Sequence, residues 1–293
     1  MKIAVYCRNA NPQDEEFANE MIHTLLQDGH EIWVTKHLKT IFDDIQQFDN
    51  HNHLKNSSAI DFLFSLGGDG TFLEAAAIVG DLGIPIVGIN TGRIGFLTGI
   101  NKKDFQSAYQ ALQNGQFTIE SRALLHLECA EVKNLPSHFA LNDITLHSAG
   151  DSFLAKFNVS IDNDTLNTYW SDGLIIATPT GSTAYSLSCG GPILFPSTEG
   201  NVITPIASHS LSVRPVVVPN RHEITVTVAG RGQSAILTMD SHRIELPIPA
   251  TIKITKETFS IHTVRFERMD FFTVIREKLY WGADKRNEER ERG

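Results

Sequence analysis

The residues best suited to chemistry form a glycine-rich turn, Gly67-Gly68-Asp69-Gly70-Thr71. The turn follows an apolar run at 59–66, which predicts a strand, and precedes an alanine-rich run at 72–79, which predicts a helix. At such a junction, glycines let the backbone approach a ligand closely, and the N–H groups of the helix N-terminus attract phosphate. The sequence therefore predicts a phosphate-binding loop at 67–71.

Asp69 is unusual in a phosphate loop, because a carboxylate repels phosphate unless a metal ion intervenes or the carboxylate takes up a proton. The combination indicates phosphoryl transfer, with Asp69 as general base toward an attacking hydroxyl or as an organiser of Mg²⁺. The alternative is a tight turn whose aspartate only caps the helix. Neither a P-loop motif nor a Gly-x-Gly-x-x-Gly motif after the first strand occurs, which argues against P-loop ATPases and dehydrogenases.

A second polar cluster lies at 171–192, where Asp172 precedes a predicted strand at 174–177 and a turn at 179–181. We expect a helix to begin after Ser182 or Thr183, either of which could cap it. The cluster suits hydrogen bonding to a nucleoside, and Tyr185 adds a ring face; turn and capping chemistry is the alternative. Six hydroxyl side chains lie close together within it, at Thr178, Thr180, Ser182, Thr183, Ser186 and Ser188.

The pair Asn142-Asp143 lies within a strand-like run at 139–147. Polar neighbours in a strand point to opposite faces or mark the end of the strand. An amide beside a carboxylate can hold ribose hydroxyls and a base edge, and an exposed turn is the alternative.

The elements that must position these groups fall into two halves. Alternating strands (2–7, 31–35, 59–66, 85–89) and helices (from 12, 38–48, 72–79) predict an α/β N-terminal domain with a doubly wound, mostly parallel sheet. Short β-branched runs at 124–132, 139–147, 153–161, 174–177, 213–218, 223–228, 234–239 and 251–255 predict a mostly β C-terminal domain.

We expect the domains to divide as follows. Residues 1–100 form the α/β domain, 101–118 a connecting helix, and 119–262 the mostly β domain. Residues 263–282 form a C-terminal segment whose helix, 271–279, returns to the first domain, and 283–293 is a charged tail.

Composition narrows the class of protein. The 293 residues are 41% hydrophobic, which is ordinary for a globular chain. The net charge of −9 argues against a nucleic-acid partner. No apolar run is long enough to cross a membrane. The three separated cysteines and the absence of an export signal predict a cytoplasmic protein with reduced thiols. The scattered histidines lack ligand spacing, so we predict no metal-binding side-chain cluster.

Taken in chain order, Gly67–Gly70, Asn142-Asp143, Asp172-Gly173 and the run 178–186 resemble the motifs of bacterial NAD kinases (ATP-NAD kinases). The resemblance covers nearly the whole chain, and 178–192 is its most specific part, because Gly-Gly-Asp-Gly also occurs in 6-phosphofructokinases and diacylglycerol-type lipid kinases. It implies transfer of the γ-phosphoryl group of ATP to the 2′-hydroxyl of the adenosine ribose of NAD. It also implies a divalent cation, usually Mg²⁺, and a homodimer or homotetramer.

The resemblance also implies residue roles. Asp69 corresponds to the general base, and Gly67, Gly68, Gly70 and Thr71 to the loop that binds the phosphates of ATP. Asp172 corresponds to a residue that reaches the nicotinamide end of NAD from a neighbouring subunit. The implied NAD-binding residues are Asp69, Gly70, Asn142, Asp143, Asp172, Thr183, Ala184, Tyr185, Ser186, Leu187, Ser188 and His242.

Two positions depart from the family pattern. Asp143 stands where a longer glutamate is usual, and Trp170 stands where several relatives carry arginine, which leaves the choice between NAD⁺ and NADH open. The donor range, the number of subunits and feedback by NADPH also stay open. The alternatives are a lipid or sugar kinase that shares the Gly-Gly-Asp-Gly loop, and a non-catalytic NAD(H)-sensing module.

Overall fold

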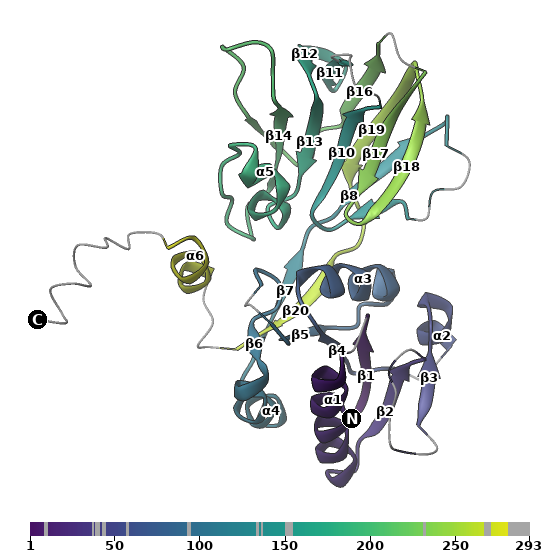
Figure 1. The fold of residues 1–293 in the computed structure, drawn as a ribbon, viewed down its shortest axis with the longest axis vertical. Coiled ribbons are helices and arrows are strands. Elements are labelled where there is room, and N and C mark those ends of the chain that lie inside the picture. The colour runs from purple at the N-terminus through teal and green to yellow at the C-terminus, as the bar shows by residue number, and fades with distance from the viewer. Residues whose placement is uncertain are drawn as a thin grey trace, which may run out of the picture. The chain divides into compact units, whose positions relative to one another are not determined.

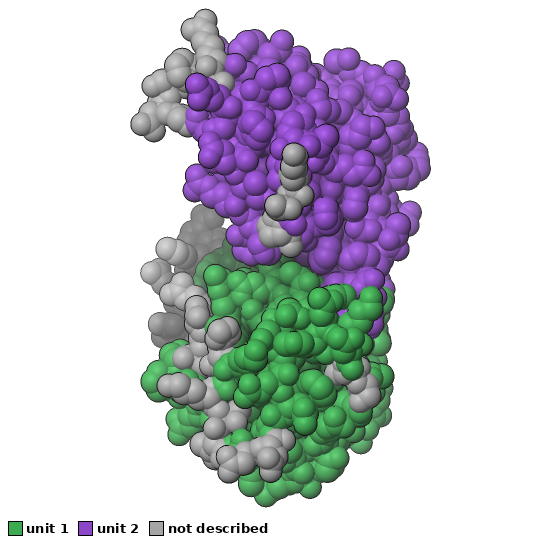
Figure 2. Space-filling model, turned by 90° about the vertical axis from the view of Figure 1, so that its right-hand side faces the viewer, with its two compact units in different colours: residues 1–78, 84–120, 262–293 green, residues 79–83, 121–261 purple. Residues whose placement is uncertain are grey.

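The computed structural model describes residues 1–280 except 9–10, 37, 39–41, 43–44, 57–58, 93–94, 133–134, 136, 150–154, 231–232 and 267–270. The chain forms two compact units, which Figure 2 shows in different colours. The first unit contains residues 1–78, 84–120 and 262–293, and the second contains residues 79–83 and 121–261. No helix of the described residues is both long and apolar enough to span a membrane.

The first unit is built on an eight-stranded sheet in the order β3-β2-β1-β4-β5-β20-β7, with β6 also paired to β5 (Figure 1). The pairs β1–β2, β1–β4, β2–β3, β4–β5, β5–β6 and β5–β20 are parallel. The strands are β1 (Lys2–Cys7), β2 (Glu31–Thr35), β3 (Gln46–Phe48), β4 (Phe62–Leu66), β5 (Ile86–Asn90), β6 (Ile100–Asn101), β7 (Thr118–Arg122) and β20 (Ile261–Arg265).

The central strands of this sheet are buried on both faces, as their continuous apolar sequences require. In β1 and β4 nearly every side chain is buried, and β5 is buried throughout. The chain runs from β1 to β2 and β3 on one side and then returns to place β4 on the other side of β1. The strand order thus reverses between β1 and β4, where open α/β sheets bind ligands outside the carboxyl ends of the strands.

Helices cover this sheet, and α1 shows why they form. The side chain of Asn11 accepts a hydrogen bond from the backbone N–H of Asp14 at 2.9 Å, and Pro12 begins the helix. Buried residues at helical spacing, such as Ala18, Met21 and Leu25, then pack in the core of the unit. The helices are α1 (Pro12–Gln27), α2 (His51–Asn56), α3 (Asp69–Val79), α4 (Phe105–Gln113) and α6 (Phe271–Leu279), with a 3₁₀ turn η2 at Lys102–Asp104.

The predicted helix at 38–48 is wrong where the structure describes it. Phe48 lies in β3, which pairs in parallel with β2 so that Thr35 stands opposite Phe48. The apolar spacing suggested a helix, but the exposed edge of β2 offered backbone partners that the local pattern does not encode. Residues 37, 39–41 and 43–44 of that prediction lie outside the described residues.

The second unit contains two six-stranded sheets, in the orders β15-β14-β13-β10-β17-β18 and β12-β11-β16-β19-β8-β9, and every pairing given for them is antiparallel. In β11, β16, β17 and β19 buried residues alternate with more exposed ones, and the buried faces form one large core. The strands are β8 (Leu125–Cys129), β9 (Phe139–Ala140), β10 (Asp143–Ser148), β11 (Ala155–Ile161), β12 (Asp164–Ser171), β13 (Gly173–Ala177), β14 (Gly200–Ile206), β15 (Val216–Pro219), β16 (Ile224–Ala229), β17 (Ser234–Met239), β18 (His242–Pro247) and β19 (Ala250–Lys256).

The second unit departs from the sequence predictions at several points, and β12, β14 and β18 are strands that the sequence did not predict. The predicted strand 139–147 is two strands in different sheets, with the chain crossing between them at Leu141 and Asn142. The predicted capping by Ser182 or Thr183 is also wrong, because the N-cap residue of α5 (Tyr185–Ser188) is Ala184, which makes no side-chain cap. Short 3₁₀ turns occur at η1 (Gly80–Leu82) and η3 (Gly181–Thr183).

The predicted fold class is confirmed. A mostly parallel α/β unit is followed by a mostly antiparallel β unit. The predicted helix at 271–279 is α6, with the predicted bounds, and the chain returns to the first unit before it forms.

Candidate functional site

The predicted phosphate loop lies at the carboxyl end of β4, where the strand passes into α3. Gly67 has φ +149°, and a Cβ added there would lie 2.3 Å from Oγ1 of Thr71, so only glycine fits. A Cβ added at Gly68 or Gly70 would meet no atom within 4 Å. The loop is therefore closed on one side by Thr71 and accessible to a ligand at Gly68 and Gly70.

Asp69 is held by the loop that follows β5. Its Oδ1 accepts hydrogen bonds from the backbone N–H of Leu97 at 3.0 Å and Thr98 at 3.3 Å, and from Oγ1 of Thr98 at 3.3 Å. Its Oδ2 accepts one hydrogen bond, from the backbone N–H of Phe96 at 2.8 Å. The described contacts of this carboxylate thus go to residues 96–98, which disfavours the alternative that Asp69 only caps α3.

This arrangement fixes the carboxylate and leaves hydrogen-bonding capacity on one oxygen. A carboxylate oxygen has two lone pairs, and Oδ2 uses one of them within the described residues. A half-buried carboxylate oriented by backbone N–H groups can accept a proton from a hydroxyl placed within hydrogen-bond reach. The geometry suits a general base.

In the second unit, Asn142 lies at the crossing between the two sheets. The carboxylate of Asp240, in the β17–β18 turn, accepts backbone hydrogen bonds from Leu141 and Asn142 at 2.8 Å and from Asp143 at 3.2 Å. Thr178 donates its hydroxyl to the carbonyl of Leu141 at 2.6 Å. The backbone of the predicted NAD-binding pair is therefore clamped from two sides.

Asp143 is buried, contrary to the alternative of an exposed turn. Burial, together with the nearby Asp240 carboxylate, raises the pKa of Asp143 to about 7, against a lowering contribution from the Thr145 hydroxyl, which donates to it at 3.0 Å. Burial also raises the pKa of Asp240, while the three backbone N–H donors favour its charged form. The pair therefore tends to hold its proton on Asp143 and its charge on Asp240.

Asp172 lies in the bend between β12 and β13 with an exposed side chain, while its backbone bonds to Ser148 and Ile206 at 3.0 Å. The rings of His147 and Tyr185 stack nearby in the same unit, with centroids 5.9 Å apart. Burial lowers the pKa of His147, and Asp172 partly opposes that shift. Tyr185 is 41% exposed, so its ring and hydroxyl are available to a ligand.

Most of the predicted hydroxyl groups of the 178–188 run are engaged within the protein. Ser182 donates to the carbonyl of Pro179 at 2.6 Å, Thr183 to that of Thr180 at 3.1 Å, and Ser186 pairs with Thr204 at 2.8 Å. Ser188 is exposed, whereas Ala184 and Leu187 are partly buried. The hydroxyls shape this segment, and Tyr185 and Ser188 are its most exposed predicted ligand residues.

His242 begins β18 directly after the Asp240 turn, opposite Met239. His242 is the weakest of the groups that oppose the burial which raises the pKa of Asp240. Among the described residues, no group of three or more histidine, cysteine, aspartate or glutamate side chains could hold a metal ion.

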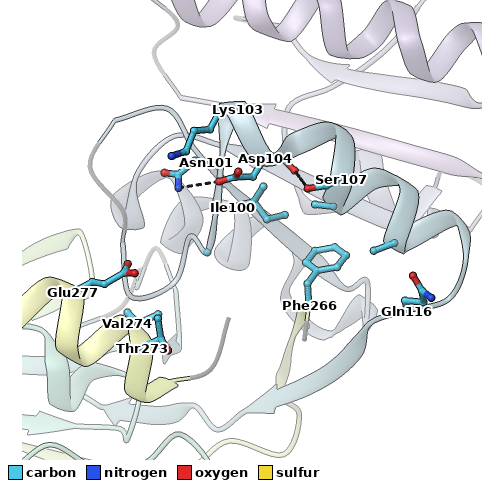
Figure 3. Close-up of a pocket in the computed structure, with 13 residues that line it drawn as sticks. Ile100, Asn101, Lys103, Asp104, Ser107, Gln116, Phe266, Thr273, Val274 and Glu277 are labelled. Atoms are coloured by element: carbon cyan, nitrogen blue, oxygen red, sulfur yellow. Dashed lines mark hydrogen bonds between the residues drawn. The ribbon is translucent and has the colours of Figure 1, made fainter. Parts of the chain in front are cut away.

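A cavity of about 720 Å³ lies elsewhere in the first unit, among residues of β6, α4 and α6. Figure 3 shows its lining, which includes Ile100, Ser107, Phe266 and Val274. None of the predicted site residues lines it, so the cavity does not mark the predicted chemistry.

Two structural partners were not predicted from the sequence. The loop at 95–98 orients Asp69 through backbone groups, which carry no signature in the residue types. Asp240 stands in a two-residue hairpin turn, where aspartate is common for its turn preference alone. Only a contact between distant segments reveals either role.

The fold and these groups define a class of protein: a two-unit nucleotide-binding chain whose parallel sheet carries a Gly-Gly-Asp-Gly turn with an oriented aspartate. Residues 3–117 match the N-terminal domain of ATP-NAD kinases, and residues 141–266 match the C-terminal domain. The chain belongs to the ATP-NAD kinase family.

Individual relatives agree with this assignment. The NAD kinase of Flavobacterium johnsoniae is 37% identical over 98% of this chain and 100% of that protein. The NAD kinase of Flavobacterium psychrophilum is 42% identical over 85% of each chain. Yeast NADH kinase complexed with NADH has a TM-score of 0.86, with 25% identity over 97% of this chain and 89% of that one. An NAD kinase from Archaeoglobus fulgidus in complex with ATP has a TM-score of 0.72, with 26% identity over 92% and 95%.

Proposed function

We propose that this chain transfers the γ-phosphoryl group of ATP to the 2′-hydroxyl of the adenosine ribose of NAD, with Asp69 as the general base. The chain is an ATP-dependent NAD kinase, because both of its parts match that family and relatives of nearly the same length carry that name. The residue assignment depends on one observation: backbone N–H groups fix the Asp69 carboxylate while Oδ2 accepts a single described bond.

The chemistry requires both positioning and proton transfer. A ribose hydroxyl is a weak nucleophile near neutral pH, and alignment with the γ-phosphate supplies much of the rate enhancement. A base at hydrogen-bond distance adds about 10²–10⁴-fold. Asp69 Oδ2 receives the 2′-hydroxyl proton as the oxygen attacks, and the backbone at Gly68 and Gly70 lies against the phosphates, where a side chain would obstruct it.

Most of the dinucleotide contacts are assigned to the second unit. Asn142 and Asp143 contact its ribose and base, Tyr185 provides a ring for stacking, and Ser188 offers a hydroxyl. Asp172 reaches its nicotinamide end. Burial of Asp143 keeps this side chain a hydrogen-bond donor below about pH 7, unlike an exposed aspartate.

Several finer points belong to the same proposal. Mg²⁺ would be held mainly by the phosphates of ATP, where it would neutralise part of their charge, because Mg²⁺ commonly takes substrate phosphates as ligands. The enzyme works as a homodimer or homotetramer in the cytoplasm, with Asp172 contributed from the neighbouring subunit.

The direct test uses the purified chain with Mg²⁺, ATP and NAD, and NADP is detected with an NADP-specific dehydrogenase. We expect NADP and ADP to form in equal amounts. Parallel reactions with diacylglycerol or fructose 6-phosphate test the lipid or sugar kinase, and NAD binding without ADP release tests the sensing module. Family membership disfavours these alternatives. Phosphate transfer to either alternative acceptor but not to NAD would overturn the proposal.

A further inference from the structure

One basic side chain stands next to the Gly67 turn and has no place in the sequence predictions. Arg8 directly follows β1, whose pairing with β4 ends at Cys7 opposite Leu66. One residue beyond that pair, Arg8 and Gly67 leave the sheet at the same edge. Figure 1 shows β1 and β4 side by side, with α3 following β4. This is the point where the strand order reverses, so Arg8 enters the region where such sheets bind nucleotides.

Arg8 is oriented by a glutamate on the helix of the phosphate loop. Its Nε lies 3.1 Å from Oε1 of Glu74, which is on α3. The other oxygen of Glu74, Oε2, accepts a hydrogen bond from the hydroxyl of Tyr6 at 2.8 Å. Tyr6 is buried on β1, and burial followed by the Glu74 contacts raises its pKa, so it stays a donor. The chain Tyr6–Glu74–Arg8 thus ties the end of β1 to the middle of α3.

The pairing leaves the terminal nitrogens of Arg8 available. The ion pair is formed through Nε, and no hydrogen bond given for the described residues engages Nη1 or Nη2. The side chain is 53% exposed, whereas that of Glu74 is 20% exposed. A guanidinium held through Nε presents two parallel N–H donors on its far side, which match two oxygens of a phosphate.

Two other described cations follow strands at the same sheet edge but are engaged differently. Lys36 pairs with Asp49, and Lys102 lies 2.6 Å from Asp14. Each ammonium is a point charge that already contacts a carboxylate. Arg8 combines proximity to Gly67 with an unused pair of donors.

We propose that Arg8 binds the polyphosphate of the nucleoside triphosphate at the Gly67 turn through Nη1 and Nη2, with Glu74 and Tyr6 as positioning residues. The inference rests on the proposed function for the identity of the donor substrate. It also changes the electrostatics expected from the sequence, in which no lysine or arginine was assigned to the phosphates. A fixed guanidinium offsets the repulsion between Asp69 and the triphosphate.

The test measures binding of a non-hydrolysable ATP analogue, with Mg²⁺ and without NAD, to the full chain and its variants. Arg8→Ala should weaken binding about ten- to a hundredfold, because two charge-assisted hydrogen bonds are lost. Arg8→Lys should restore only part of that loss, because lysine lacks the bidentate geometry. The affinity of Arg8→Ala for inorganic tripolyphosphate, which has no nucleoside, should fall by the same factor.

Lys2 provides a matched control at the amino end of the same strand, where it pairs with Glu31 at 3.3 Å. Lys2→Ala should bind the analogue like the unaltered chain, and both variants should keep the thermal midpoint, since exposed ion pairs stabilise little. In turnover, Arg8→Ala should raise the KM for ATP and leave the KM for NAD unchanged.

Unchanged analogue binding by Arg8→Ala would overturn the inference, as would an equal loss in Lys2→Ala. The binding assay contains no acceptor. If the chain failed to phosphorylate NAD, the proposed function would be contradicted, but the binding assay would still show whether Arg8 contacts the triphosphate.

Discussion

A Cβ atom added at Gly95 would lie 1.7 Å from Oδ1 of Asp69, so the backbone of Gly95 packs directly against the carboxylate. Gly95→Ala should therefore displace the carboxylate without removing it. We expect kcat to fall about 10²-fold, because small misplacements of a reacting group have effects of that size. Steady-state rates of NADP formation check this.

Gly92→Ala is the matched control in the same loop, because its Cβ would come no closer than 3.9 Å to another atom. This variant should keep kcat near that of the unaltered chain. Equal rates for the two variants would contradict the assigned position of Asp69.

Alanine substitutions at Gly70 and Gly67 should have opposite effects on the free energy of unfolding. Gly70→Ala adds a methyl group in open space at the start of α3, so the free energy of unfolding should stay equal or rise by up to about 1 kcal/mol. The same methyl group obstructs the phosphates, and we expect the KM for ATP to rise about tenfold or more.

Gly67→Ala should destabilise the fold, since its Cβ would lie 2.3 Å from Thr71. Thermal unfolding and ATP titration of both variants test the contrast. An unchanged KM in Gly70→Ala would place the phosphates elsewhere.

Stability should depend on pH through Asp143. Its pKa is raised to about 7 by burial and by Asp240, so between about pH 4 and 7 the folded chain binds a proton that the unfolded chain releases. The contribution of Asp143 to the free energy of unfolding is therefore complete below that window and lost as pH rises through it. Asp143→Asn keeps the shape of the side chain without its charge. The thermal midpoint of this variant, relative to that of the unaltered chain, should therefore be higher at about pH 8 than at about pH 5.

Asp240→Asn is the informative comparison. An amide cannot replace a carboxylate that accepts three backbone N–H bonds, so this variant should be less stable by about 1.5–3 kcal/mol or more near neutral pH. A midpoint difference for Asp143→Asn that did not change with pH would show that Asp143 does not titrate in this window.

Local features of the sequence predicted the turn at 67–71, the α/β and mostly β halves and the helix at 271–279, because each depends on neighbouring residues. The partners of the site groups could not be predicted in this way. Phe96–Thr98 hold Asp69 from 27–29 positions away, and Asp240 reaches Asn142 across 98 positions. Apart from the Thr98 hydroxyl, the donors in both cases are backbone N–H groups, which every non-proline residue carries.

Asn142 also shows why the strand at 139–147 was predicted as continuous. Apolar and β-branched residues continue past it. The crossing between sheets depends on the Asn142 backbone, whose N–H donates to the Asp240 carboxylate and whose carbonyl accepts from the backbone N–H of Thr178. Arg8 was missed for a related reason. Its role depends on the reversal of strand order that brings β1 beside β4, and the segment around it carries no motif.

The most direct test of the central claim is the rate of NADP formation by Asp69→Asn with Mg²⁺, ATP and NAD at saturation. The account predicts a rate about 10²–10⁴-fold below that of the unaltered chain, because the base is lost. NAD affinity should be largely retained, because most of the implied dinucleotide contacts lie in the second unit. A rate close to that of the unaltered chain would contradict the assignment of Asp69 as the base.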